Sequence, residues 1–216
     1  MFFSAYVIVL SMASTTTARN KAATAGSTKF SGRALSAKVL KSRVAFRSPI
    51  FYVTTEQVRE PSGVTARRDV VRHPGSIVVM AVDDTRQPWR VLLIRQYRYA
   101  AGCELWELPA GRIDEGEKTL AAAKRELLEE TGITAQRWKR ALTFFSSPGF
   151  LDETMALFLA RGLQQGQAQP EEDEVIHARF FPLSLAVKMV MTGKISDAKT
   201  IAGILWLDKF YATPSR

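Results

Sequence analysis

Short runs of apolar and β-branched residues, separated by Pro, Gly or Asp, follow one another along the first half of the chain. They predict strands at four places: Phe51–Val58, Val64–Arg72, Ser76–Val82 and Arg90–Tyr97. The segments Ile77–Val82 and Val91–Ile94 are almost continuously apolar, which indicates strands covered on both faces. We therefore expect ordered structure to begin near Lys38 and to contain the buried centre of a sheet.

A strong helical pattern follows, from Glu117 to Thr131. It is rich in Ala and Leu, contains no Gly or Pro, and is followed by Gly132, which is suited to end a helix. The remaining pattern predicts strands at Arg140–Ser146, Met155–Ala160 and Ala178–Pro182, and helices over about Leu183–Met191 and Ala198–Tyr211. Strands on both sides of a helix, followed by two more helices, predict an α/β fold with helices packed on a mixed sheet.

The positive charge of the chain is concentrated near its start. The formal net charge is +9, but residues 1–50 contain eight Lys or Arg and no Asp or Glu. The other 166 residues hold 22 basic and 21 acidic side chains, so a basic groove for nucleic acid is not indicated. We interpret residues 1–37 as a disordered basic tail or a targeting segment, whose apolar start is too short to span a bilayer.

The chain has a single cysteine, Cys103, which rules out an intrachain disulfide and fits a reducing compartment. We therefore expect a cytoplasmic protein without a membrane or nucleic-acid partner. The composition of the first residues also resembles an organellar transit peptide, so targeting stays open as an alternative.

Three carboxylates crowd the end of the predicted helix. Glu126, Glu129 and Glu130 lie within about a 100° arc, where like charges three or four residues apart destabilise a helix. They also lie at its C-terminal end, where the helix dipole disfavours negative charge. A hard divalent cation such as Mg²⁺ or Mn²⁺ removes both objections, because it binds carboxylate oxygens and neutralises the cluster. The alternative is a solvated acidic face paired with Lys124 and Arg125.

The spacing of the whole stretch GRIDEGEKTLAAAKRELLEETGI decides between these alternatives. Seven fixed identities between Gly111 and Gly132, followed by the apolar Ile133, match the Nudix box without a departure. Chance agreement is on the order of 10⁻⁸ to 10⁻⁹ per start position. The chain therefore resembles the Nudix hydrolase superfamily. The resemblance implies an α-β-α sandwich with a mixed central sheet, a loop–helix–loop catalytic motif, and substrates that link a nucleoside diphosphate to another group.

The resemblance also implies roles for residues of the box. The metal ligands would be the side chains of Glu126, Glu130 and Glu129, the last directly or through water, and the main-chain carbonyl of Ala110. Arg125 would pair with Glu117 and hold the catalytic motif together. The implied cofactor is Mg²⁺, with Mn²⁺ as an alternative. A metal suits this chemistry, because hydrolysis of a negatively charged pyrophosphate requires charge neutralisation and an activated water.

Two segments beside the box narrow the substrate class. LIRQYRYAAGCELWELPAG, before the box, and SSPGFLDE, after it, resemble ADP-ribose pyrophosphatases, whose marker proline about fifteen residues beyond the box corresponds to Pro148. The candidate substrate-binding residues are Arg95, Arg98, Glu107, Pro148, Gly149 and Phe51. The alternatives are exposed strand positions for the arginines, support of the metal for Glu107, an ordinary turn for Pro148–Gly149, and core packing for Phe51.

A general base is still needed, and the acidic segment QPEEDEVI is the candidate. In ADP-ribose pyrophosphatases a glutamate on a mobile loop late in the chain activates the water, and matching Ile176 to the family assigns this role to Glu172. A mobile loop suits a base that engages only after the substrate binds. The neighbouring acids Glu171, Asp173 and Glu174 remain alternatives, as does Glu129 of the box.

The resemblance covers about residues 38–212. It predicts a Nudix hydrolase domain over residues 75–216 that cuts ADP-ribose to AMP and ribose 5-phosphate. Residues 38–74 are β-rich and are predicted to form a dimerisation region, because the ADP-ribose pyrophosphatases are homodimers. Two other functions stay open: a pyrophosphatase for another nucleotide sugar such as GDP-mannose, and a non-catalytic Nudix-like sensor. The complete box argues against the sensor.

Overall fold

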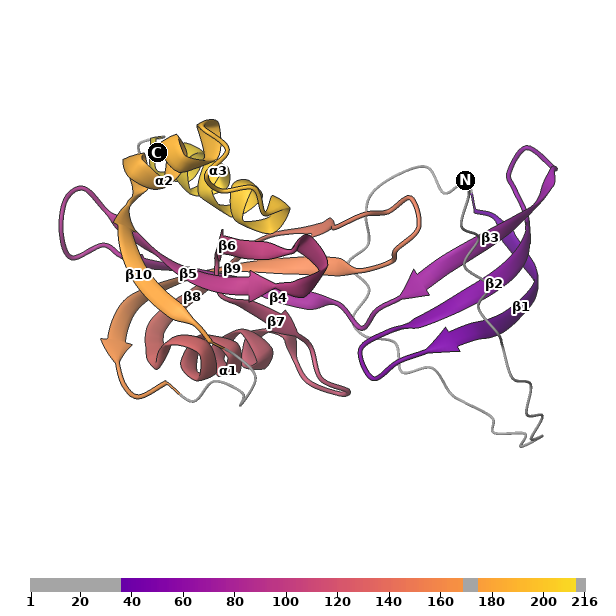
Figure 1. The fold of residues 1–216 in the computed structure, drawn as a ribbon, viewed down its shortest axis with the longest axis horizontal. Helices are drawn as coiled ribbons and strands as arrows, with labels where there is room; N and C mark the ends of the chain where they lie inside the picture. Colours follow the sequence, from indigo (N-terminus) through magenta and orange to yellow (C-terminus); the bar gives the residue numbers. More distant parts are fainter. Residues whose placement is uncertain (1–35, 169–174, 213–216) are drawn as a thin grey trace, which may run out of the picture.

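The computed structural model describes residues 36–168 and 175–212, which form two sheets (Figure 1). The smaller one, which we call the N-terminal sheet, is antiparallel and contains β1 (Lys38–Arg47), β2 (Tyr52–Arg59) and β3 (Thr65–Arg72). It projects from the side of the molecule, and β1 is exposed along its whole length. Among the described residues, no strand pairs with the outer edge of β1.

The central sheet has seven strands and is mixed. Its main path runs in the order β10 (His177–Pro182), β5 (Arg90–Arg98), β4 (Ser76–Asp83), β9 (Thr154–Gln165) and β8 (Ile133–Phe145). Only the β4–β9 pair is parallel among these neighbours. Two short strands, β6 (Cys103–Glu107) and β7 (Ala110–Arg112), pair with β5 and β4 respectively. This pairing places Glu107 and Ala110 between the two central strands.

Helices cover both faces of the central sheet (Figure 1). The helix α1 (Thr119–Thr131) lies on one face, and α2 (Leu183–Met191) and α3 (Ala198–Ala212) lie on the other. Alternate residues of β4 serve the two layers: Ile77 and Val79 belong to the core under α1, while Val78 and Met80 belong to the core under α2 and α3. The predicted α-β-α sandwich with a mixed sheet is confirmed.

Several element boundaries differ from the sequence prediction. The helix predicted from Glu117 begins at Thr119, because the Glu117 carboxylate is held in the preceding loop, where it accepts the Asp114 N–H at 3.2 Å. The strand expected from Arg140 begins at Ile133; it lies at the edge of the sheet, so its exposed side carries polar residues that hide the pattern. The exposed β1 and the short β6 and β7 were not predicted as separate strands.

The predicted tail, residues 1–37, lies almost entirely outside the described residues. Among the helices of the described part of the chain, none is long and apolar enough to cross a bilayer.

Candidate active site

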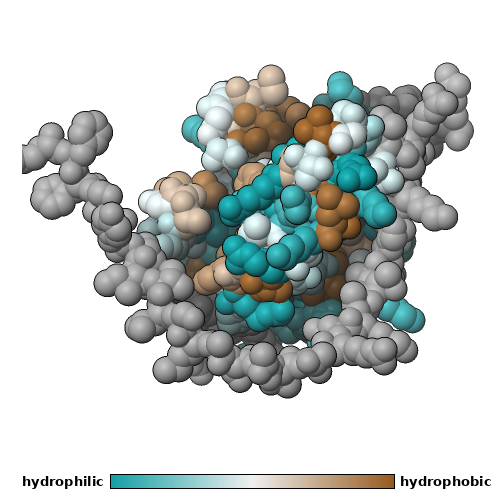
Figure 2. Space-filling view, turned by 90° about the vertical axis from the view of Figure 1, so that its right-hand side faces the viewer, coloured by the Kyte–Doolittle hydropathy of each residue, from teal (hydrophilic) through white to brown (hydrophobic). Residues whose placement is uncertain are grey.

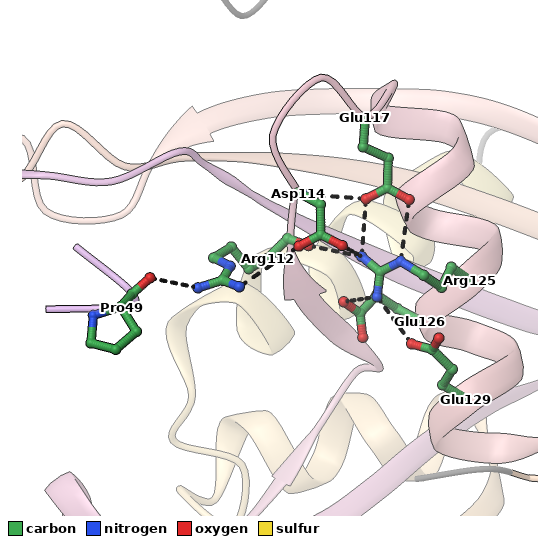
Figure 3. A network of polar contacts seen from close by, with 7 residues as sticks. All are labelled: Pro49, Arg112, Asp114, Glu117, Arg125, Glu126 and Glu129. Atoms are coloured by element: carbon green, nitrogen blue, oxygen red, sulfur yellow. Dashed lines mark hydrogen bonds and ion pairs between the residues drawn. The ribbon is translucent and has the colours of Figure 1, made fainter. Parts of the chain in front are cut away.

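Arg125 is the centre of the polar network in the box (Figure 3). Its Nε and Nη2 donate to the two oxygens of Glu117 at 3.2 and 3.0 Å, and its Nη1 donates to Glu126 at 2.8 Å and Glu129 at 3.0 Å. The Nη2 also donates to the carbonyl of Arg112 at 3.1 Å. The hydrogen bonds to Glu117 raise the pKa of Arg125 despite desolvation, and in return they lower the pKa of Glu117.

The backbone of Ala110 and Gly111 approaches two of the carboxylates closely. A Cβ at Gly111 would lie 2.1 Å from the carboxylate carbon of Glu126, so a larger residue at this position would displace the Glu126 carboxylate from its observed place. The Ala110 N–H donates to Glu130 Oε2 at 3.2 Å, and Glu130 is buried. Strand β7 and the last turns of α1 thus bring together the backbone and acidic groups expected to bind a metal.

These donors fit a hard divalent cation in their chemistry, because Mg²⁺ and Mn²⁺ prefer carboxylate and carbonyl oxygens. In residues 36–168 and 175–212, no group of three or more His, Cys, Asp or Glu side chains is already arranged around a metal position. Instead, Arg125 Nη1 holds Glu126 and Glu129. These hydrogen bonds engage one oxygen of each carboxylate, Glu126 Oε1 and Glu129 Oε2.

A second charged network lies beside the box and centres on Glu107, which is 1% exposed. Arg98 donates to both of its oxygens, with Nε–Oε1 and Nη2–Oε2 distances of 2.9 Å, and Lys199 forms an ion pair with Oε2. Burial raises the pKa of Glu107, but the hydrogen bonds from Arg98 and the charge of Lys199 outweigh it and hold the pKa below its usual range. The buried carboxylate therefore stays ionised.

The start of α3 fixes this network in place. Asp197 accepts hydrogen bonds from the Thr200 N–H at 3.0 Å and its Oγ1 at 2.6 Å, and it forms an ion pair with Lys199 at 3.0 Å. The Leu108 N–H in turn donates to Thr200 Oγ1 at 2.8 Å. The first turn of α3 thus holds the backbone that leads from Glu107 into the box.

The sequence reasoning did not find Asp197, Lys199 and Thr200. The only local signal is an Asp, a Lys and a Thr around the start of a predicted helix, which reads as an ordinary N-terminal cap. Their partners Glu107 and Leu108 are 92 residues away in the sequence. No spacing rule connects such distant positions, so only the fold reveals the contact.

The two candidate arginines of β5 do not converge. Arg98 faces Glu107, whose hydrogen bond is the main cause of the raised pKa of Arg98, with a smaller contribution from the charge of Glu130 in the box. Arg95 lies on the opposite face of the strand, where it pairs with Glu104 at 2.5 Å and lies over the Trp106 ring. Arg98 is therefore the better placed of the two to meet a substrate bound at the box.

The other candidate residues lie on two loops between strands. Pro148 and Gly149 are in the connection between β8 and β9, and Phe51 follows the turn from β1 to β2, with its ring 6.0 Å from that of Phe46. In the same turn, the Pro49 carbonyl accepts a hydrogen bond from Arg112 Nη1 at 3.1 Å (Figure 3). The candidate base Glu172 lies outside the described residues.

Comparison with known proteins agrees with this geometry. The NUDIX domain family matches residues 71–203. The ADP-ribose pyrophosphatase of Bacillus subtilis (strain 168) is 33% identical over 81% of this chain and 94% of its own length. The methanol dehydrogenase activator of Bacillus methanolicus is 31% identical over 82% and 95%. A crystal structure of an ADP compounds hydrolase has the same fold, with a TM-score of 0.69 at 21% identity over 83% and 96% of the two chains.

Proposed function

The chain belongs to the Nudix family, and we propose that it hydrolyses the pyrophosphate of ADP-ribose to AMP and ribose 5-phosphate with the help of Mg²⁺. One observation carries the proposal: Glu126 and Glu130 meet the backbone of Ala110 and Gly111 in a complete Nudix box. The substrate is proposed from the B. subtilis relative, which spans most of the chain and is named for ADP-ribose.

The metal would be held by the carboxylates of Glu126, Glu129 and Glu130 and by the carbonyl of Ala110. When bound, it would supply charge neutralisation and an activated water. Arg125 contributes by holding Glu117 and the loop before α1, which fixes the direction from which the carboxylates face the substrate. In this proposal Arg125 holds the residues of the box in position and does not itself touch the scissile bond.

Arg98 is proposed to bind a phosphate of the substrate. Its Nε and Nη2 are committed to Glu107, whereas its Nη1 makes no hydrogen bond to any described residue and the side chain is 38% exposed. Two cations, Arg98 and Lys199, face two anions, Glu107 and Asp197, so the network has no excess charge and Arg98 would offer an anionic ligand its Nη1 donor. Glu107 would then act on the substrate through Arg98.

Hydrolysis also requires removal of a proton from the attacking water. Water would add to one phosphorus, the bond from that phosphorus to the bridging oxygen would break, and a carboxylate would take the proton. We propose Glu172 for this role. Its segment lies between β9 and β10 in the sequence, and its acids are not among the proposed metal ligands. Glu171, Asp173 and Glu174 are the alternatives within the same segment.

The N-terminal sheet is proposed to form a homodimer interface. Figure 2, which faces this end of the molecule, shows brown patches among teal polar residues. The edge strand β1 and the turn after it carry exposed apolar residues. They include Val39, Val44, Phe46 and Ile50. An uncovered apolar edge favours association. Sedimentation at micromolar concentration should show a dimer, and an active monomer would rule this proposal out.

A substrate panel tests the function. We expect ADP-ribose with Mg²⁺ to yield AMP and ribose 5-phosphate on chromatography, with lower kcat/KM for GDP-mannose and other nucleotide sugars. Glu126→Gln is the negative control, because it removes one charge from the proposed metal site. Preference for another nucleotide sugar would support the alternative substrate, and no turnover of any of them would favour a regulatory role such as the name of the B. methanolicus relative describes.

A further inference from the structure

The loop that carries Pro148 and Gly149 is joined to the end of the N-terminal sheet through its backbone. The Val71 N–H donates to the Phe150 carbonyl at 2.8 Å, and the Asp152 N–H donates to the Val71 carbonyl at 3.1 Å. Val71 and Leu151 form a parallel bridge. The second half of the loop is therefore paired with the end of β3 at a single bridge.

Asp152 is the point at which side chains fasten this loop. Its Oδ2 accepts a hydrogen bond from Arg72 Nη1 at 3.1 Å, and its Oδ1 accepts one from the His73 N–H at 2.9 Å. Both carboxylate oxygens are thus bound to the segment that leaves β3. A carboxylate with charge-assisted contacts on both oxygens has one preferred orientation, which also fixes its backbone.

Arg72 is itself held by the middle strand of the N-terminal sheet. Its Nη2 donates to Glu56 Oε1 at 2.8 Å and its Nε to Thr54 Oγ1 at 3.2 Å. Burial raises the pKa of Glu56, but the hydrogen bond and charge of Arg72 outweigh this effect and lower the pKa overall, so the pair remains ionised. The guanidinium therefore uses all three nitrogens, two on β2 and one on the loop.

The same sheet also touches the box. The Pro49 carbonyl in the β1–β2 turn accepts a hydrogen bond from Arg112 Nη1 at 3.1 Å. The Arg112 carbonyl in turn accepts one from Arg125 Nη2 at 3.1 Å (Figure 3). Two loops beside the site, one with Pro148 and one with the start of the box, are thus both in contact with the N-terminal sheet. These contacts form within one chain and need no second subunit.

We propose that Arg72 is a positioning residue that clamps Asp152, so that the N-terminal sheet of the same chain sets the shape of the Pro148–Gly149 loop and through it the affinity for substrate. The part that concerns affinity rests on the proposed function, because it takes this loop to contact the nucleotide sugar. The clamp itself rests only on the contacts of Arg72, Asp152 and Glu56.

Amide hydrogen exchange of the full chain without substrate tests the clamp. The Phe150, Leu151 and Asp152 amides are hydrogen-bonded, and we expect Arg72→Ala to speed their exchange about tenfold or more. Asp152→Asn is a milder variant, since Asn keeps an acceptor for the His73 N–H and leaves Arg72 with Glu56. The control is Arg137→Ala, which removes a strand-to-loop pair with Asp84 of the same 3.1 Å length at another place. Unchanged exchange in both test variants would overturn the proposal.

Steady-state kinetics with ADP-ribose separates positioning from a general loss of structure. We expect each variant to raise KM about three- to thirty-fold with kcat within about threefold, and the double variant to be no worse than the worse single variant. If the KM increases of the two single variants multiplied in the double variant, or if kcat alone fell, positioning through Asp152 would be contradicted. A wild-type protein inactive on ADP-ribose would contradict the proposed function instead, and the exchange rates would still decide whether the clamp exists.

Discussion

Arg125 holds Glu117 at two points, with Nε–Oε1 and Nη2–Oε2 distances of 3.2 and 3.0 Å. Its remaining nitrogen reaches Glu126 and Glu129. One guanidinium thus joins the loop before α1 to two acids on the helix, and its charge offsets their mutual repulsion. Glu117, Glu126 and Glu129 are thus stabilised by this arginine without a cation.

Arg125→Lys should damage the box although it keeps the positive charge. A lysine ammonium cannot make the forked contact with Glu117 while also reaching Glu126. We expect the free energy of unfolding to fall by about 1–2 kcal/mol and kcat/KM to fall about tenfold or more. Urea denaturation and steady-state kinetics measure the two effects. Arg137→Lys, at an exposed pair with Asp84, should change stability by less than about 0.5 kcal/mol; equal losses in the two variants would refute the special role of the fork.

Gly111→Ala tests the close approach between the backbone and Glu126. The added Cβ would lie 2.1 Å from the carboxylate carbon of Glu126, so the side chain has to move away. Since Glu126 is a proposed metal ligand, we expect the Mg²⁺ concentration needed for half-maximal activity to rise about tenfold or more. Metal titration of activity measures this. The double variant Gly111→Ala/Glu126→Gln should be little worse than Glu126→Gln alone, and independent effects would show that Gly111 acts elsewhere.

Lys199→Met should destabilise the protein through Glu107. The variant removes one cation from a carboxylate that is 1% exposed and leaves Asp197 without its lysine partner. We expect a loss of about 3 kcal/mol in the free energy of unfolding at pH 7, the scale for breaking a buried ion pair. Urea denaturation measures it. Lys194→Met, in the exposed turn before the same helix, is the control and should change stability by less than about 0.5 kcal/mol.

The same pair predicts the direction of a pH effect. The folded-state pKa of Glu107 is lowered, so its contribution to stability is fully present above the unfolded pKa of about 4.3 and is lost as the pH falls through the folded pKa. The difference between wild type and Lys199→Met should therefore be largest near pH 7 and shrink below about pH 4. A difference that grows on acidification would contradict this account of Glu107.

Part of the box was readable from the sequence because its contacts are local. Helical spacing predicted that Glu126, Glu129 and Glu130 cluster, whereas the pairing of Glu117 with Arg125 was implied by the resemblance to the Nudix box. The buried strands around Ile77–Val82 were also predicted, because a nearly continuous apolar run occurs only where both faces are covered. Both predictions rest on rules that act over about twenty residues or fewer.

Contacts between distant segments were not readable in this way. Asp152 and Arg72 are 80 residues apart, and no pattern near either one indicates the other. The different placement of Arg95 and Arg98 is a separate case, because the two-residue period of a strand puts positions three apart on opposite faces. That difference follows from a local rule, but only once the strand is known to continue through Arg98.

Glu172 is proposed as the general base although it lies outside the residues that the structure describes. Glu126 and Glu129 share Arg125 and are proposed to bind metal, so their oxygens already have partners other than the attacking water. A general base near neutral pH needs a carboxylate that is free of such partners until the substrate binds. The segment between β9 and β10 supplies four acids, from Glu171 to Glu174, and Glu172 is the one that the family resemblance assigns.

Glu172→Gln should lower kcat about 10²- to 10⁴-fold, while KM and the Mg²⁺ requirement stay close to wild type, because the lost proton transfer matters chiefly in the transition state. Glu171→Gln is the matched control, an identical change at the adjacent position, and should cost less than about tenfold. Steady-state kinetics over a Mg²⁺ titration measures all three quantities. The reverse ranking would move the role to Glu171. If these two variants and Glu174→Gln all retained near-normal rates, the base would have to be sought in the box, with Glu129, the most exposed of its three clustered acids, as the first residue to test.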